Sequence, residues 1–191
     1  MPEAEFEERE QGRLAVGDGW FLLNARDAVW VDQPGRGRYP ALERRGNFDQ
    51  LGVTLIVLGP GEPMAMYHWE SDQEDFLVLS GEAVLVIEDE ERPLRQWDFV
   101  HCPPGTGHVI VGAGEGPCVV FGVGSRERHT YRDSEGVLHG RDDAGAYTVS
   151  AAAVRLGAGV EEKTADAASA YARFPERELV RYRDDWLPDL D

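Results

Sequence analysis

Short apolar runs recur along the middle of the chain and are separated by turn-forming or charged residues. The runs occupy positions 53–58, 76–79, 83–88, 97–102, 108–111 and 118–123. The stretches between them are rich in glycine, proline, aspartate and glutamate, as at 59–63 and 103–107. Because such short strands follow one another at intervals of about 10 residues without intervening helices, the pattern predicts an antiparallel β-sandwich or closed barrel. A parallel βαβ sheet is not indicated.

Residues 83–87 form a continuous apolar run, Ala-Val-Leu-Val-Ile, rather than an alternating one. A strand with apolar side chains on both sides has both faces buried in its own chain, or has one face covered by another subunit. Both alternatives are open from the sequence. The second of them is the basis for predicting a homodimer.

The chain on either side of this β-rich stretch has a different character. Residues 1–19 are rich in glutamate and poor in apolar side chains, which predicts a flexible acidic segment. Residues 20–125 form the predicted barrel, and residues 126–191 form an extension with one short helix at 165–173, where Thr164 or Asp166 is the candidate N-cap. The last part, 177–191, interleaves charged and apolar side chains and is expected to dock on the barrel or on a partner subunit.

Composition and charge fit a single domain with extensions and narrow the range of partners. The chain has 191 residues, 42% of them hydrophobic, and its 22 glycines and 11 prolines suit many tight turns. A net charge of −17 repels phosphate backbones and anionic lipid, so we expect neither nucleic acid nor a membrane as a partner. We expect no leader peptide and no membrane span, and hence a cytoplasmic location. Cys102 and Cys118 are expected to be free thiols.

The first stretch with candidate chemistry runs from Gly61 to Gly81. On a strand, His68 and Glu70 point to the same face, and Glu74 stands at the head of the next strand. Imidazole nitrogen and carboxylate oxygen are ligands of divalent Zn, Fe, Mn and Ni. Taken by itself, the group is more typical of an ordinary polar surface cluster than of a metal site.

The second stretch contains a rigid turn followed by a histidine. Pro103, Pro104 and Gly105 form the turn, and His108 opens the strand that follows it. A turn fixed by proline loses little conformational entropy when it positions a ligand. His108 is therefore the second histidine that could take part in a metal site.

Together these two stretches resemble the motifs of the cupin superfamily, commonly written G-x5-H-x-H-x3/4-E-x6-G and G-x5-P-x-G-x2-H-x3-N. In the first motif His68, Glu74 and Gly81 stand at the family positions with the family spacing. Glu70 replaces the second histidine, and Gly61 lies one residue upstream of the opening glycine position.

The second motif also matches with two departures. Pro103, Gly105 and His108 are in place, whereas Trp97 stands at the glycine position and Gly112 at the asparagine position. The two motifs follow each other in the family order, with a β-rich stretch between them. The resemblance covers residues 53–124 and implies a double-stranded β-helix, also called a jelly-roll barrel.

The resemblance further implies a divalent metal (Zn, Fe, Mn or Ni) inside the barrel, held by His68, Glu74 and His108. The fourth ligand position is occupied by Glu70. If Glu70 coordinates, two imidazoles and two carboxylates surround the ion and make it a weaker Lewis acid. If it does not, the remaining set of two histidines and one carboxylate leaves Glu70 free as a catalytic general base.

Three functions agree with these residues. The first is a metal-dependent enzyme, of oxygenase or isomerase type, acting on a small organic molecule. The second is a binding module that encloses a small ligand, with a structural metal or none. The third is a structural or storage dimer in which the site has lost its role. The absence of a recognisable helix-turn-helix disfavours a sensor with its own DNA-binding output.

Overall fold

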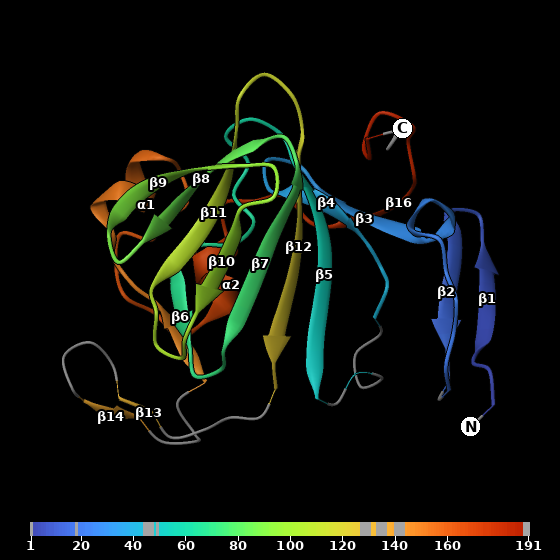
Figure 1. Ribbon diagram of the computed structural model, residues 1–191, viewed down its shortest axis with the longest axis horizontal. Helices are drawn as coiled ribbons and strands as arrows, with labels where there is room; N and C mark the ends of the chain where they lie inside the picture. The colour runs from blue at the N-terminus through green and yellow to red at the C-terminus, as the bar shows by residue number, and fades with distance from the viewer. Residues whose placement is uncertain are drawn as a thin grey trace.

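Two antiparallel β-sheets pack face to face and form the centre of the molecule (Figure 1). The structure is a computed structural model that describes residues 2–17, 19–43, 48, 50–126, 131–132, 137–139 and 144–188. Among these residues, the larger sheet has seven strands in the order β10 (Phe99–Cys102), β7 (Glu74–Ser80), β12 (Cys118–Ser125), β5 (Leu51–Leu58), β4 (Gly37–Pro40), β3 (Val29–Gln33) and β16 (Glu178–Arg181). The smaller sheet, within the same residues, has five strands in the order β15 (Gly145–Tyr147), β6 (His68–Glu70), β11 (His108–Ala113), β8 (Glu82–Ile87) and β9 (Glu90–Arg95).

The chain passes from one sheet to the other at almost every connection between β5 and β12. The strands β5, β7, β10 and β12 belong to the larger sheet, while β6, β8, β9 and β11 belong to the smaller sheet. Their pairings are antiparallel. This winding is a double-stranded β-helix, and it confirms the predicted all-β fold.

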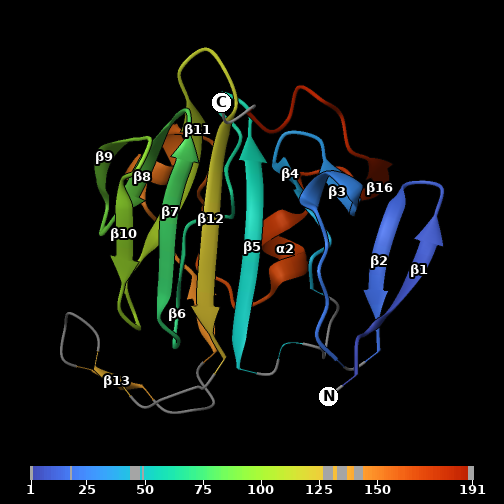
Figure 2. The same cartoon turned by 45° about the vertical axis from the view of Figure 1, so that its right-hand side comes forward.

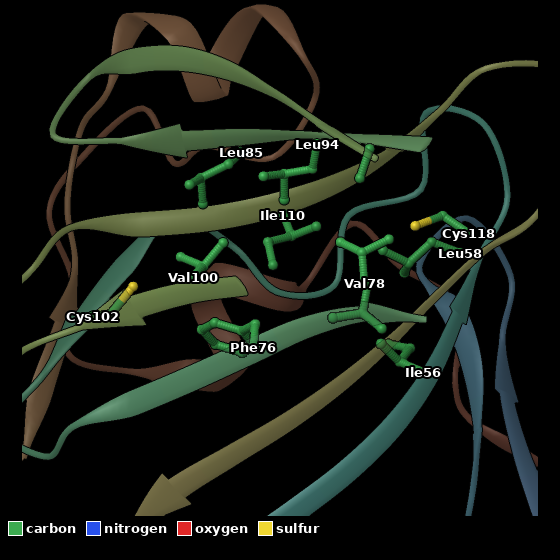
Figure 3. Packing of buried hydrophobic residues seen from close by; sticks show 12 residues of the cluster. Ile56, Leu58, Phe76, Val78, Leu85, Leu94, Val100, Cys102, Ile110 and Cys118 are labelled. Atoms are coloured by element: carbon green, nitrogen blue, oxygen red, sulfur yellow. The ribbon is translucent and has the colours of Figure 1, made fainter. Parts of the chain in front are cut away.

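One apolar core fills the space between the two sheets (Figure 3). Side chains two positions apart share a face of a strand, and the pairs Ile56 and Leu58 on β5 and Phe76 and Val78 on β7 all point inward. Ile110 meets them from the smaller sheet. The other members of this core are Ala83, Leu85, Leu94, Val100, Cys102, Cys118 and Val120. Both cysteines are free thiols, as predicted.

The outer face of the smaller sheet is covered by the extension of the same chain. Val86, Val109 and Val111 point away from the main core and pack with alanines of α1 (Ala151–Arg155) and the segment that follows it. Val86 is completely buried by this packing. The apolar run at 83–87 is therefore buried on both faces within one chain, which is the first of the two alternatives. The homodimer stays a prediction.

The outer face of the larger sheet is covered in the same way. Trp30 on β3 is fully buried and packs against Trp186, with ring centroids 5.0 Å apart. Val57 and Val119 complete this second apolar cluster. Because β16 also pairs with β3, the last described part of the chain is both a strand of the sheet and a cover over it.

The opening residues form a hairpin at one end of the molecule, built from β1 (Glu5–Arg9) and β2 (Gly12–Val16) (Figure 2). Glu8 and Arg13 are register partners, and their side chains form an ion pair at 2.9 Å. The flexibility expected of residues 1–19 stays a prediction. The acidic composition gave no signal for these two strands, whose pairing is supported by side chains of opposite charge on facing positions.

The described residues contain two short α-helices where the sequence predicted one. α2 (Ala167–Tyr171) confirms the predicted helix, and the Asp166 side chain caps it by accepting from the N–H groups of Ala168 and Ser169. α1 is too short to show a helical period in the sequence. The remaining elements are η1 (Ala25–Asp27), β13 (Tyr131–Arg132) and β14 (Leu138–His139). None of the described helices is long and apolar enough to cross a membrane.

Candidate metal centre

His68 and His108 lie directly opposite each other on neighbouring strands of the smaller sheet. His68 is the first residue of β6, His108 is the first residue of β11, and the two are register partners. Opposed residues of antiparallel strands place their side chains side by side on one face. The two imidazole ring centroids are 5.1 Å apart. The strand register alone therefore brings the two imidazoles together.

Glu74 reaches the same point from the larger sheet. It is the first residue of β7, which the chain enters after crossing between the sheets at 71–73. Its Oε2 lies 3.2 Å from Nε2 of His108 and 3.9 Å from Nε2 of His68. One ligand atom from each of the three residues lies within 4.8 Å of the others. The structure thus brings together the three residues that the motif spacing singled out.

Hydrogen bonds to the backbone fix how both imidazoles face. Nδ1 of His68 is 2.8 Å from the carbonyl oxygen of Met66, and Nδ1 of His108 is 3.0 Å from that of Thr106. Because a carbonyl oxygen only accepts, each Nδ1 carries the proton and donates it. Each Nε2 is then left to face the carboxylate of Glu74. Histidine metal ligands in proteins are usually oriented by such a bond from the second ring nitrogen.

The turn before His108 is tied to the strand that carries His68. Gly105 has a φ of 85°, a left-handed conformation that glycine adopts without strain, and Thr106 closes the turn by donating to the carbonyl of Pro103 at 3.1 Å. The N–H of Gly105 donates to the backbone carbonyl of Glu70 at 2.7 Å. The two motif segments therefore hold each other in place.

The three side chains fit a divalent cation. His108 is 3% exposed, and the side chains of His68 and Glu74 are 13% and 18% exposed. Oε2 of Glu74 is buried and forms no hydrogen bond of regular geometry in the described part of the chain; it faces the two Nε2 atoms, that of His108 at 3.2 Å. A buried carboxylate that is not fully hydrogen-bonded costs free energy. A borderline cation bound by two imidazoles and this oxygen removes that cost.

The charges of Glu74 and His108 depend on each other. Burial lowers the pKa of His108, but its polar contacts with Cys102 and Glu74 outweigh burial and raise the pKa to about 10. Burial raises the pKa of Glu74, but His108 and then His68 outweigh it, so that this pKa lies below its ordinary value. Both shifts favour a charged pair. A cation ligated at the same point takes the place of the proton on Nε2 of His108.

Glu70 lies beside this cluster rather than within it. Its Oε1 is 3.4 Å from Nε2 of His68, and its side chain is 42% exposed. The group of three described above, with ligand atoms within 4.8 Å of one another, does not include it. Whether Glu70 is a fourth ligand or a free base stays a prediction.

A cavity of about 290 Å³ adjoins the three side chains. Glu70 and core residues such as Ile56 and Phe76 contribute to its lining. Four further lining residues were not singled out from the sequence: Arg36, Tyr39, Tyr147 and Tyr171. All four lie outside the two motifs and reach the cavity through the extension or through β3 and β4. No local sequence signal marks them.

The two departures in the second motif have a structural account. Trp97 keeps the backbone conformation of the glycine it replaces, with a φ of 75°, and its side chain is 64% exposed. At Gly112, a Cβ atom would lie 2.2 Å from the carbonyl oxygen of Gly59, so no larger residue fits without a shift of the backbone. Neither change touches the three candidate ligands.

Other chemically interesting residues stay outside the site. His101 is half exposed on the outer side of β10, with its Nδ1 2.6 Å from Oδ1 of Asp75. The side chain of Cys102 belongs to the main core and also contacts His108, but it is not one of the three clustered residues. Met66 and Tyr67 are buried packing residues. His129 lies outside the described residues.

Comparison with known proteins agrees with this geometry. Residues 54–124 match the model of the cupin domain. No curated protein matches the chain.

Several solved structures are similar to the chain. One is titled a sugar phosphate isomerase from a cupin superfamily, from Silicibacter pomeroyi DSS-3, with 26% identity over 56% of this chain and 78% of that chain, and a TM-score of 0.43. Another is the polyketide cyclase RemF from Streptomyces resistomycificus. It has 19% identity over 61% of this chain and 86% of that chain, with a TM-score of 0.49. A conserved protein with a double-stranded β-helix domain from Klebsiella pneumoniae has 20% identity, coverage of 50% and 83%, and a TM-score of 0.44.

With TM-scores below 0.5, these structures carry no argument about the reaction of this chain. The family assignment rests on the domain match, which includes both motifs and the three clustered side chains. It also rests on the winding of β5 to β12 between two sheets. Residues 54–124 of this chain are therefore a cupin domain.

Proposed function

We propose that this protein is a metal-dependent enzyme that acts on a small organic molecule by proton transfer of the isomerase type. It holds one divalent cation through Nε2 of His68, Nε2 of His108 and a carboxylate oxygen of Glu74. The observation that carries the proposal is the convergence of these atoms beside a cavity, with both Nδ1 atoms already bonded to backbone carbonyls. Such a prearranged donor set favours binding of a cation.

A divalent cation held there supplies Lewis acidity and polarises a carbonyl or hydroxyl oxygen of the substrate. In this proposal Glu70 acts as the base. Its carboxylate lines the same cavity and is 3.4 Å from Nε2 of His68, so it lies next to the donor set without belonging to the group of three. A carboxylate in that position can remove a proton from the carbon beside the polarised oxygen.

Tyr147 supplies a proton donor in the same cavity. It lies opposite His68 in the strand register, and the two rings have centroids 5.7 Å apart. Burial raises the pKa of Tyr147 well above its usual value, and Tyr171 raises it further. The hydroxyl therefore stays protonated near neutral pH. It can donate a hydrogen bond to substrate oxygen while Glu70 holds the proton taken from carbon.

The proton balance of the proposed step closes on the substrate. Glu70 takes a proton from the carbon next to a carbonyl, and the C–H electron pair forms a new carbon–carbon double bond as the carbonyl electrons move to oxygen. The proton then returns to the former carbonyl carbon. The hydroxyl on the carbon that was deprotonated gives its proton to the former carbonyl oxygen and becomes the new carbonyl, which completes the isomerisation. An oxygenase uses the same ligand set but makes no use of Glu70 as a base.

Metal content tests the binding part of the proposal. The purified wild-type chain, dialysed against Zn²⁺ and then against buffer, should retain about one ion per chain by elemental analysis. The variants His68→Ala, His108→Ala and Glu74→Gln should each bind Zn²⁺ at least ten times more weakly than the wild type. His101→Ala is the matched control, because this histidine is on the outer surface and should leave the metal content unchanged. Equal metal content in His101→Ala and His108→Ala would contradict the proposed site.

Glu70→Gln tests the catalytic part. The variant should retain its metal, because the three remaining ligands are intact. Deuterium uptake from D₂O into small hydroxyaldehydes and hydroxyketones, followed by NMR, should fall by about 10²-fold or more relative to wild type. Loss of the metal in Glu70→Gln would instead make Glu70 a fourth ligand. Full metal content with no exchange in the wild-type protein would favour a binding module.

A further inference from the structure

Arg36 brings a positive charge into the lining of the candidate cavity. The residue precedes β4, and its side chain is partly buried. It donates to the side-chain oxygen of Gln33 at 2.9 Å and to the carbonyl of Met64 at 2.8 Å. The guanidinium carbon also lies 4.3 Å from the ring centroid of Tyr171. These contacts hold the guanidinium in one orientation, and every group named in them is neutral.

No carboxylate among the described residues forms an ion pair with this guanidinium, although Glu70 and Glu74 line the same cavity. Arg36 takes part in none of the ion pairs between them, and its Nε is buried without a hydrogen-bond partner. The side chains that act on its charge are Arg177, which has the same sign, and three tyrosines. Burial is the main reason that the pKa of Arg36 is lowered, yet a guanidinium remains charged.

Arg38, two residues farther along, is paired with carboxylates, as a partly buried arginine usually is. Its side chain is 23% exposed, and its guanidinium pairs with Asp32 at 3.5 Å and with Glu62 at 3.2 Å. Both arginines are therefore partly buried, but only Arg38 is neutralised by the protein. A buried charge that is not paired costs free energy. At Arg36 that cost is removed when an anion enters the cavity.

From this contrast we infer that the substrate of the proposed site is a small oxyanion, a carboxylate or a phosphate ester, whose anionic group binds Arg36. That the bound anion is the substrate rests on the proposed function. The binding of the anion at Arg36 does not. The hydroxyls of Tyr39, Tyr147 and Tyr171 line the same cavity and offer further hydrogen bonds. A volume of about 290 Å³ is at the small end of ligand pockets, so the molecule has the size of a short metabolite.

The charge of the whole molecule makes this assignment selective. With a net charge of −17, the protein repels anions in general. Binding of an anion therefore depends on a local cation and not on a diffuse positive field. A structural role of Arg36 alone, stacking on Tyr171, predicts no preference for charged over neutral ligands.

The test compares pairs of probes that differ in charge: lactate with lactamide, and glycerol phosphate with glycerol. Isothermal titration at fixed salt is carried out on the full chain, both after chelator treatment and after loading with Zn²⁺. We expect the charged member of at least one pair to bind about ten times more tightly than its neutral partner. The pair that shows the effect tells a carboxylate from a phosphate ester.

Variants assign the effect to Arg36. Arg36→Gln should abolish the preference for the charged probe, and Arg36→Lys should keep part of it. Arg173→Gln is the matched control: it removes one positive charge from an exposed position that does not line this cavity. Circular dichroism and thermal melting establish that each variant folds. If Arg36→Gln does not fold, the comparison of Arg36→Lys with Arg173→Gln still tests the inference. Arg36→Lys should lower the preference for the charged probe, and Arg173→Gln should not.

The outcomes separate this inference from the proposed function. Equal binding of charged and neutral probes, binding of neither, or an unchanged preference in the Arg36 variants would overturn the inference. Those results leave the Zn²⁺ content of the protein unaffected. Conversely, an Arg36-dependent preference in a chain that binds no Zn²⁺ would support the inference and contradict the metal-dependent enzyme.

Discussion

At the scale of single residues, the positions that depart from the family motifs tell more than those that match. Trp97 occupies a left-handed conformation that glycine adopts freely, and nothing buries its side chain to compensate. Gly112 occupies a place where the backbone of Gly59 leaves no room for a Cβ atom. Sequence spacing identifies such positions, but only the backbone shows which conformation each one demands.

The strain at Trp97 is measurable by comparing two substitutions. Trp97→Gly and Trp97→Ala both remove the same exposed indole, but only glycine relieves the positive φ. We expect the glycine variant to be more stable than the alanine variant by about 1 kcal/mol, even though glycine gains more entropy on unfolding. Urea denaturation of both variants gives the difference. An alanine variant at least as stable as the glycine variant would show that this backbone is not strained.

At the scale of elements, each strand found from the sequence pattern contributes two or more buried apolar side chains. The six apolar runs all coincide with strands of the two sheets. β9 escaped notice, because Leu94 is its only buried residue and Pro93 interrupts it; both features are usual in the edge strand that it forms. α1 escaped notice because its sequence, Ala-Ala-Ala-Val-Arg, gains its position from packing and capping rather than from an amphipathic period.

Capping attaches α1 to the barrel. The Ser150 side chain accepts from the N–H of Ala153 at 3.1 Å and donates to Asp89 at 2.6 Å, and Asp89 follows β8. Ser150→Ala should therefore lower the free energy of unfolding by about 1 to 2 kcal/mol. Val149→Ala, at a neighbouring side chain that is 57% exposed, is the control and should change it by less than about 0.5 kcal/mol. Similar losses in both variants would argue against a special role of the cap.

The same contact gives a pH dependence. The hydrogen bond from Ser150, followed by that from the N–H of Ala152, holds the pKa of Asp89 below its ordinary value of 3.8. The stability that Asp89 contributes is thus fully present above that ordinary value, and it is lost as the pH falls through the lowered folded-state pKa. The difference in stability between wild type and Asp89→Asn should shrink as the pH is lowered below about 4. A difference that stays constant down to pH 2 would contradict this linkage.

At the scale of the whole molecule, the extension is part of the site as well as of the core. β15 places Tyr147 opposite His68, and α2 places Tyr171 where its hydroxyl accepts from the N–H of Met66 at 3.2 Å. The candidate triad of His68, Glu74 and His108 could be predicted, because the three residues stand at fixed positions of two short motifs. Arg36 and the tyrosines could not, because tertiary pairing of distant segments brings them to the cavity.

The docking of the last described segment should be essential for stability. Trp186 is 5% exposed and packs on the fully buried Trp30. Trp186→Ala should lower the free energy of unfolding by about 3 kcal/mol or more, because it leaves a large cavity beside Trp30. Trp20→Ala is the control, since that side chain is 56% exposed, and should cost less than about 1 kcal/mol. Comparable effects of the two substitutions would contradict the proposed packing.

The central claim is that three side chains from two sheets hold one cation. A crystal structure of the Zn²⁺-loaded protein, with anomalous data collected at the zinc edge, tests it most directly. The account predicts one ion at about 2.0 to 2.3 Å from Nε2 of His68, Nε2 of His108 and a carboxylate oxygen of Glu74, with Glu70 outside bonding distance. An ion held elsewhere, or no ion between these residues in a zinc-saturated crystal, would contradict it.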